Sequence, residues 1–214
     1  MAEFEKPKLR KRSLIMKKLL VGALALMAVA CNAPEPKASS PIGAWKIDPA
    51  QSTLSLVTVK KGAVAESHVF KTVNGDVAPD GNAKIVVDLA SIATENDDRD
   101  SRMKEFLFEV AKYPTATVTA KLDPAKFENL GVGDRRIEPV SLIVDLHGGK
   151  AQVDADVYVT RLSDDRILVE TVKPIVLESE DFGFLPGLEK LKELAELSAI
   201  TPAAPVAFSV VLVR

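Results

Sequence analysis

Apolar and polar residues alternate with a period of two along most of residues 44–214, a pattern typical of β-strands that bury one face. The clearest run is 153–160, where Val153, Ala155, Val157 and Val159 occupy every second position. Similar patterns predict further strands at 44–48, 52–60, 67–74, 85–89, 115–122, 142–146, 166–173 and 206–212. The domain is therefore predicted to be mainly β.

Short turn signals separate these predicted strands. They are Asp48-Pro49, Lys61-Gly62, Asn74-Gly75, Pro79-Asp80-Gly81, Gly148-Gly149 and Ser163-Asp164-Asp165. Many strands joined by hairpin-length links predict an antiparallel barrel or sandwich. No internal repeat interrupts the pattern.

Two segments have helical spacing instead. Residues 98–112 place four apolar side chains at i, i+3, i+4 and i+7: Met103, Phe106, Leu107 and Val110. Asn96 or Asp97 can cap this helix, and Tyr113-Pro114 ends it. A second stripe at 187–198 consists of Leu188, Leu191, Leu194 and Ala195. Both helices need an apolar surface to cover, and the open ends of a barrel supply one.

The N-terminal residues have a different composition. Lys17-Lys18 is followed by a short apolar run, 19–30, and then by Cys31, which predicts a signal peptide over residues 1–30 with its true start at Met16. Ala28-Val29-Ala30-Cys31 resembles the bacterial lipobox and implies lipidation of Cys31. Residues 31–43 are rich in Pro, Ala and Ser and predict a flexible tether. The folded domain is then 44–214.

The charge distribution excludes one class of partner. Of 28 basic and 30 acidic residues, seven basic and two acidic ones lie in residues 1–30. The remaining chain is acidic and has no basic stripe, which argues against nucleic acid binding.

Few residues can support chemistry. The chain has one cysteine, Cys31, and two histidines, His68 and His147, without metal-ligand spacing. We expect His147 to be exposed at a hairpin tip and leave open which face of its strand His68 occupies. The acidic residues of 95–100 are interpreted as a capped helix start with local ion pairs, because their spacing lacks the glycine and final glutamate of a calcium loop. We predict no catalytic residue, no metal site and no enzyme activity.

Several motifs resemble the YceI-like, polyisoprenoid-binding family. Residues 45–52, W-K-I-D-P-A-Q-S, are similar to its W-x-I-D-P-x-H-S, and Phe70 to Gly75 resembles its F-x-x-F-x-G with valine at the second aromatic position. Ser91-Ile92, Arg99-Asp100, Phe108 and Lys112-Tyr113-Pro114 follow in the family's order, and Asp181-Phe182-Gly183 precedes the last strand. The resemblance covers residue 44 to the C-terminus.

The resemblance implies an extended, lipocalin-like antiparallel β-barrel of about eight strands with two short amphipathic helices. Its elongated channel would hold an isoprenoid, of quinone or polyprenyl type, or another amphiphilic lipid, and no other cofactor. The residues predicted to line the channel are Leu54, Leu56, Phe70, Ile85, Val87, Met103, Phe106, Leu107, Val118, Leu142, Val144, Val157, Phe182, Phe208 and Val210.

The sequence departs from the family pattern at two polar positions. Gln51 replaces a histidine, and Arg102 stands where a histidine commonly follows the Arg-Asp pair. Both are candidate head-group contacts, although for Arg102 the favoured interpretation is a solvent-facing ion pair.

Three functions remain open from the sequence. The favoured one is carriage or sequestration of a lipid in the bacterial envelope, by a protein anchored at Cys31, facing the periplasm and attached to the outer membrane. The alternative is an envelope lipoprotein that docks a membrane partner and whose lumen is filled by its own side chains. The third is an enzyme with a polar pair at the channel mouth. A homodimer is also left open.

Overall fold

The computed structural model describes residues 43–214, so the predicted signal peptide, Cys31 and nearly all of the tether lie outside the described residues. Twelve strands within this range form one antiparallel sheet. They are β1 (Trp45–Ile47), β2 (Thr53–Lys60), β3 (Val64–Phe70), β4 (Val73–Val77), β5 (Asn82–Asp88), β6 (Ile92–Ala93), β7 (Thr115–Lys121), β8 (Arg135–Leu146), β9 (Gly149–Ser163), β10 (Arg166–Thr171), β11 (Ile175–Glu178) and β12 (Ala203–Val213).

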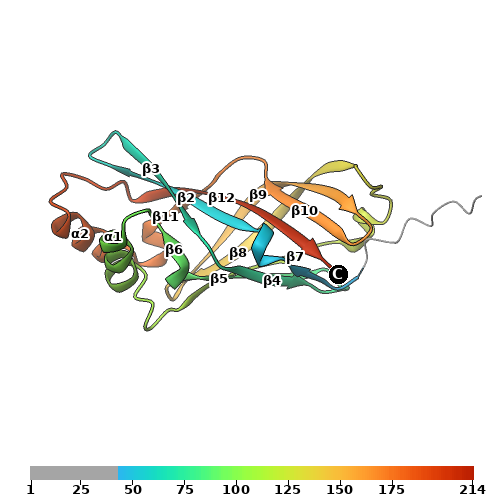
Figure 1. Ribbon diagram of the computed structural model, residues 1–214, viewed down its shortest axis with the longest axis horizontal. Helices are drawn as coiled ribbons and strands as arrows, with labels where there is room; N and C mark the ends of the chain where they lie inside the picture. Colours follow the sequence, from blue (N-terminus) through green and yellow to red (C-terminus); the bar gives the residue numbers. More distant parts are fainter. Residues whose placement is uncertain (1–42) are drawn as a thin grey trace, which may run out of the picture. The chain divides into compact units, whose positions relative to one another are not determined.

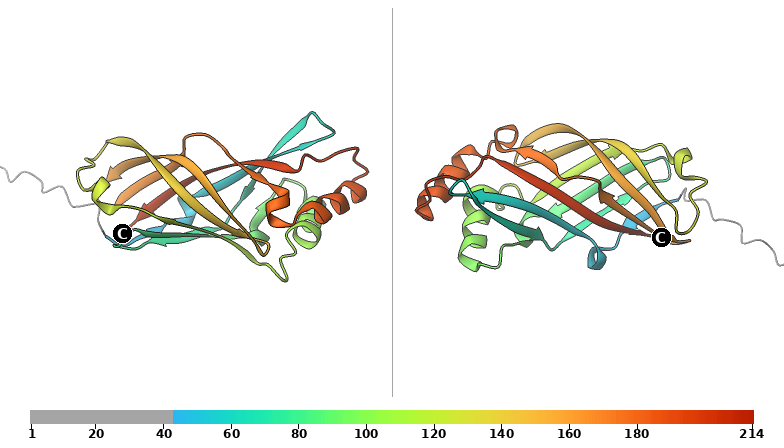
Figure 2. Two further views of the ribbon diagram at one scale, coloured as in Figure 1. Left: turned by 180° about the vertical axis from the view of Figure 1, so that it is seen from behind. Right: turned by 90° about the horizontal axis from the view of Figure 1, so that it is seen from above.

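The sheet closes into the predicted eight-strand barrel. Neighbouring strands follow the order β1-β4-β5-β7-β8-β9-β10-β12, and β1 pairs with β12 to close the ring. At the other end of β12 the sheet continues through β2, β3 and β6 on one side and β11 on the other. The views in Figures 1 and 2 show the long, tilted strands of this barrel.

The helices gather at one end of the barrel, opposite the C-terminus (Figure 1). They are α1 (Asp97–Arg102), which continues directly into the π-helix η3 (Met103–Leu107), and α2 (Leu185–Leu194). Short 3-10 turns occur at η1 (Pro49–Gln51), η2 (Leu89–Ser91), η4 (Pro124–Phe127) and η5 (Ser179–Phe182). The Asn96 side chain accepts a hydrogen bond from the Arg99 backbone N–H, which confirms it as the N-cap of α1.

The alternating pattern correctly predicts which face of most strands is buried. In β8 the side chains of Leu142, Val144 and Leu146 are buried and those between them are exposed. In β9 Ala155, Val157 and Val159 are buried and those between them are half-buried. Val144 and Leu146 belong to one of the two core clusters, and Val157 and Val159 belong to the other. The alternating pattern therefore identifies which side chains of these strands face the lumen.

The turn predicted at Asn74-Gly75 is wrong, because both residues lie inside β4. The chain bends earlier, between β3 and β4. Gly75 has φ of 153°, and a Cβ atom there would come within 2.1 Å of the Lys84 carbonyl oxygen on β5. Glycine is required here by a close approach of two strands, which a turn signal resembles in sequence.

We expect Gly75→Ala to lower the free energy of unfolding by about 3 kcal/mol, because the new methyl group meets backbone that cannot move without breaking the β4–β5 pairing. The control is Gly62→Ala at the β2–β3 hairpin tip, where φ is 74° and no heavy atom lies within 4 Å. Strain alone should cost about 1 kcal/mol there. Urea unfolding of both variants measures the difference, and equal losses would contradict the steric account.

Candidate functional site

Two apolar cavities occupy the barrel interior. The helix-end cavity has a volume of about 170 Å³, and the opposite-end cavity, lined by Trp45 and Ile47 among others, has a volume of about 140 Å³, both partly open to solvent. The side chains that border both cavities are Ile85, Val118, Leu142, Phe208 and Val210. Packed protein interiors contain few voids larger than a water molecule. The lumen therefore contains apolar space toward both ends that its own side chains do not fill.

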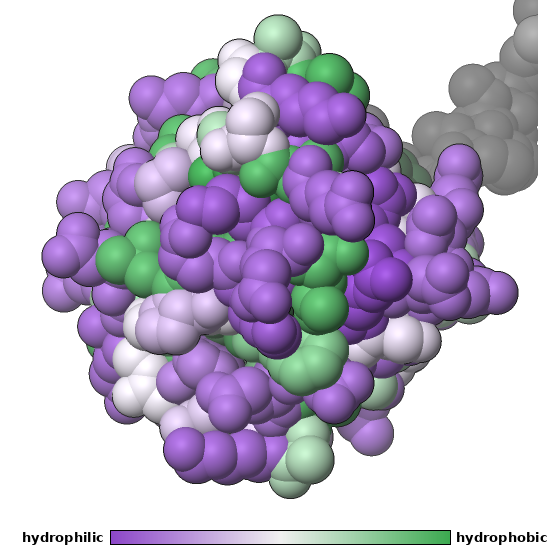
Figure 3. Space-filling model, turned by 90° about the vertical axis from the view of Figure 1, so that its left-hand side faces the viewer, coloured by the Kyte–Doolittle hydropathy of each residue, from purple (hydrophilic) through white to green (hydrophobic). Residues whose placement is uncertain are grey.

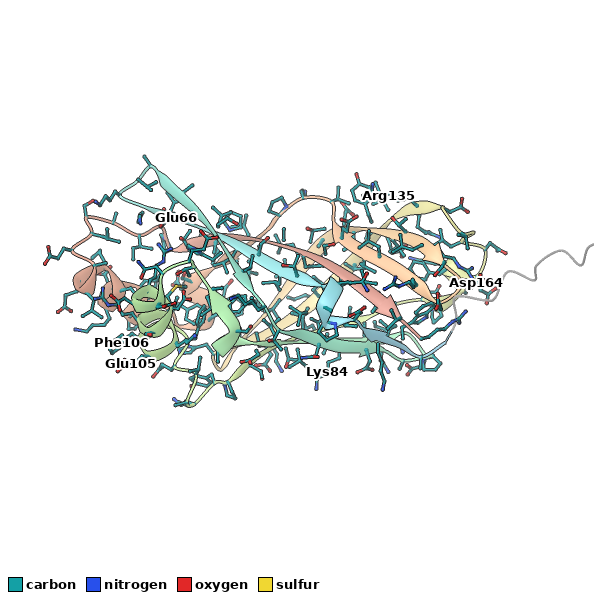
Figure 4. All side chains as sticks on the ribbon, in the orientation of Figure 1. Glu66, Lys84, Glu105, Phe106, Arg135 and Asp164 are labelled. Carbon is teal, nitrogen blue, oxygen red and sulfur yellow. The ribbon has the colours of Figure 1, made fainter. Side chains whose placement is uncertain are left out.

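Most of the predicted lining residues border these cavities. The helix-end cavity is lined by Leu54, Leu56, Phe70, Ile85, Val87, Met103, Leu107, Val118, Leu142, Val144, Phe182, Phe208 and Val210. Val157 lines the opposite-end cavity. Phe106 lines neither, and lies beside Glu105 at the rim of the helix end (Figure 4).

The π-helix explains why Phe106 is displaced. The predicted stripe assumed 3.6 residues per turn from Met103 onward, whereas the Phe108 backbone N–H donates to the Met103 carbonyl oxygen, five residues back, at 2.8 Å. This wider turn carries Phe108 to the inner face in place of Phe106, and Val110 packs beside the core without lining either cavity. The helix also ends earlier than the predicted residue 112.

An aromatic cluster that the helical pattern did not reveal closes the helix end. The ring of Phe108 meets Phe70 at 5.7 Å and Phe184 at 5.8 Å between centroids, both edge to face. Phe184 lies just before α2, outside any periodic run. From α2 itself, Leu188 reaches the cavity, and Gly187 packs so closely on η3 that a Cβ atom would lie 2.5 Å from the Phe106 carbonyl oxygen. The two helices thus form one wall over the cavity.

A polar pocket adjoins the helix-end cavity. Thr58, Met103, Leu107, Leu188 and Ile200 border both spaces. The remaining lining of the polar pocket is largely charged or polar and includes Lys60, Glu66, His68, Asn96, Asp98, Arg99 and Arg102. Figure 3 looks onto this end, where hydrophilic side chains cover most of the surface and hydrophobic ones show between them.

Glu66 organises the charges of the polar pocket. Its carboxylate accepts from Lys60 Nζ at 2.8 Å and from Arg99 Nη1 at 2.9 Å. The hydrogen bond from Lys60, together with Arg99, holds the pKa of Glu66 below its usual value. Arg99 also donates to the side chain and backbone of Thr94. The positive charges of Lys60 and Arg99 are therefore paired with the Glu66 carboxylate.

His68 lines the polar pocket and is only 3% exposed. Its Nε2 lies 2.8 Å from the Thr58 hydroxyl. Burial, and secondarily the charge of Arg99, lower the pKa of His68, which keeps the ring neutral near pH 7. The sequence left the orientation of this side chain open, and the structure places it in the polar pocket.

The two candidate head-group contacts, Gln51 and Arg102, lie in different parts of the structure. Arg102 lines the polar pocket, where its Nη1 donates to the Leu194 carbonyl oxygen at the end of α2. Gln51 lies in the η1 turn, is exposed, and donates to Asp48 at 2.5 Å. It lines neither apolar cavity nor the polar pocket.

The prediction of an exposed His147 is wrong. Its side chain is 11% exposed and lies against the rings of Tyr113 and Phe184. Nδ1 donates to the Phe182 carbonyl oxygen at 3.0 Å, and Nε2 lies 2.6 Å from Glu109. The β8–β9 hairpin tip folds against the connections at the helix end, a tertiary contact that strand periodicity does not report.

Comparison with known proteins identifies the family. The model of the YceI-like domain matches residues 45–212, nearly all of the described chain. The chain belongs to the YceI-like domain family. A solved polyisoprenoid-binding domain from Saccharophagus degradans, implicated in plant cell wall breakdown, is similar to it at 36% identity and a TM-score of 0.78, over 79% of this chain and 98% of that one.

A second solved structure shares the YceI-like fold at lower identity. BcnA of Burkholderia cenocepacia is 19% identical, with a TM-score of 0.59 over 77% of this chain and 98% of that one. None of the curated proteins compared with the chain matches it. Among residues 43–214 no helix is long and apolar enough to cross a membrane. The same residues contain no group of three or more His, Cys, Asp or Glu side chains placed to hold a metal ion.

The buried, neutral His68 predicts a specific pH dependence of stability. The imidazole of His68 takes up a proton below about pH 6.5 in the unfolded chain, whereas the folded state resists protonation. The free energy of unfolding should therefore decrease by up to about 1.4 kcal/mol for each unit that the pH falls below that point. We expect the melting temperature to drop more between pH 7 and pH 5 in the wild type than in His68→Asn. Other titrating groups are common to both proteins and cancel. Equal drops would mean that folded His68 accepts the proton freely.

Proposed function

We propose that this protein binds a long apolar or amphiphilic lipid of the isoprenoid class inside its barrel. The observation that carries the proposal is the pair of apolar cavities that share five bordering side chains along the barrel axis. The polyisoprenoid-binding domain that is 36% identical supports the ligand class. A flexible, branched hydrocarbon tail fits a long lumen lined by Val, Leu, Ile and Phe.

Burial of the tail would supply most of the affinity. Transfer of a methylene group from water into an apolar site contributes about 0.8 kcal/mol. A tail of several isoprene units can therefore bind tightly without a polar contact, even after the cost of ordering it. α1, η3 and α2 cover one end of the lumen, and their packing through Gly187 would limit the exchange of ligand with water.

Finer features of the function belong to the same proposal. We propose a quinone or polyprenyl type of ligand, carried or sequestered in the bacterial envelope. The predicted lipid on Cys31 would hold the domain at the outer membrane on its periplasmic side, through the tether at 31–43. Binding, without chemical conversion of the ligand, accounts for the apolar lumen. An envelope lipoprotein that docks a partner without lipid is the alternative, and it predicts a filled lumen.

Protein purified under native conditions should release a stoichiometric lipid on organic extraction, identified by mass spectrometry as an isoprenoid. The apolar cavities give the physical reason, since an empty apolar lumen of this size is costly to leave exposed to water. Delipidated protein should take up isoprenoid from vesicles. If it yields no lipid and acquires none from vesicles, the proposal is wrong.

A bulky side chain placed where the two cavities meet should shorten the lipid tail that the lumen can hold. Val118 borders both cavities from β7. We expect Val118→Phe to reduce affinity for a long-chain isoprenoid at least tenfold while a short-chain analogue still binds, because the ring closes the passage.

The matched control is Thr117→Phe, on the opposite face of β7 and outside both cavities. Competition against a fluorescent apolar dye measures each affinity. If Val118→Phe lowers the affinity for short and long ligands equally, or lowers neither affinity, the two cavities do not serve as one channel.

A further inference from the structure

One buried polar atom beside the lumen lacks a partner. No atom of residues 43–214 forms a hydrogen bond with Nδ1 of His68, and the atom is closed to water. Buried polar atoms in native proteins are almost always paired, so an orphan of this kind requires an explanation. His68 borders the polar pocket, and its partner Thr58 borders both that pocket and the helix-end cavity. The orphan nitrogen thus belongs to a pair at the junction of charged and apolar surface.

The Thr58–His68 pair can present either hydrogen-bonding role at Nδ1. A neutral imidazole carries one proton, and a threonine hydroxyl both donates and accepts. When the hydroxyl donates to Nε2, Nδ1 carries the proton and is a donor. When Nε2 donates to the hydroxyl, Nδ1 is an acceptor. Burial and the charge of Arg99, which lower the pKa of His68, keep both forms neutral. No change of net charge accompanies the exchange.

The charges around the pair disfavour an anionic ligand. Lys60 and Arg99 are bound to Glu66, and Arg102 donates to a carbonyl oxygen of α2. The carboxylates of Glu66 and Asp98 line the same pocket and would repel a phosphate. A neutral head group with oxygens avoids this repulsion and still satisfies the orphan nitrogen. Met103, a flexible side chain that borders both spaces, is the one whose movement would most easily admit such a group.

We propose that the Thr58–His68 pair is a head-group contact that binds both a neutral carbonyl acceptor and a neutral hydroxyl donor. Oxidised and reduced isoprenoid quinones are ligands of this chemistry, so the protein would hold both redox forms with similar affinity. The inference rests on the proposed function, since it requires that a tail occupy the lumen. It adds the residues that recognise the head group and their tolerance of both of its redox forms.

The test compares four probes of matched chain length: an isoprenoid quinone, its quinol, the corresponding polyprenyl phosphate, and a polyprenyl hydrocarbon without a head group. His68→Asn places an amide near the position of Nδ1, and the amide can donate or accept. His68→Gln places its amide nearer the position of Nε2, so it retains the Thr58 contact and loses the ligand contact. The two variants are therefore a matched pair for the two ring nitrogens.

We expect the wild type to bind quinone and quinol within about threefold of each other, and His68→Asn to retain both. His68→Gln should bind both about three- to tenfold more weakly, the effect of one lost hydrogen bond, with hydrocarbon binding unchanged. In the wild type, imidazole nitrogen NMR should show the proton on Nδ1 with quinone and on Nε2 with quinol. This measurement needs no variant, so it decides the matter even if a His68 variant does not fold.

Three results would overturn the inference: unchanged quinone and quinol binding in His68→Gln, the same tautomer with both ligands, or phosphate binding more than tenfold tighter than quinone. The last would assign the head group to an anion held by Arg102. If the wild type binds none of the probes, including the hydrocarbon, the proposed function itself fails. Hydrocarbon binding without any His68 effect would leave the proposed function standing and remove only the head-group contact.

Discussion

Backbone pairing along β12 closes the barrel, and both apolar cavities depend on it. Near its C-terminal end this strand pairs with β10 on one side and β1 on the other, and near its N-terminal end with β11 and β2. The chain leaves the sheet between β1 and β2 and again between β10 and β11. These interruptions allow the strands beside β12 to change direction while they stay hydrogen-bonded to β12. The result is a long barrel whose lumen is bounded by inward Val, Leu, Ile and Phe side chains from all sides.

The two ends of that lumen differ because different elements cover them. At the helix end, aromatic rings from β3, the turn after η3 and the start of α2 meet edge to face, and charged side chains of β2, β3 and α1 lie outside them. At the other end Glu138 faces inward from β8, buried and paired with Lys126 and Arg136. Polar groups thus lie near both ends of an apolar interior, and only the helix end has a buried imidazole with an unpaired nitrogen.

Strand periodicity predicted the strands, because burial of one face has the same local signature in each of them. It left a barrel or a sandwich open, and the resemblance to the YceI-like family implied the barrel. The misses arise where periodicity gives no signal, either from contacts between distant segments or from an irregular helical turn. Asn74-Gly75 resembles a turn, but Gly75 is needed for close approach to β5. The π-turn after Met103 exchanged Phe106 for Phe108, and no residue spacing in the segment signals it. The charged start of β8 hid a strand whose inward glutamate is neutralised by partners on η4 and β8 itself. His147 was expected in solvent for the same reason.

The proposed site separates affinity from selectivity. Apolar burial is nondirectional and scales with tail length, so a lumen of this kind distinguishes lipids by length and bulk and hardly by chemistry. A single hydrogen bond contributes far less than the tail, yet it acts on the part in which quinones, phosphates and hydrocarbons differ. A neutral imidazole at the lumen's edge adds discrimination against charge while tolerating a change of redox state. That combination suits a carrier better than a catalyst, because it stabilises both forms of a ligand and favours no transition between them.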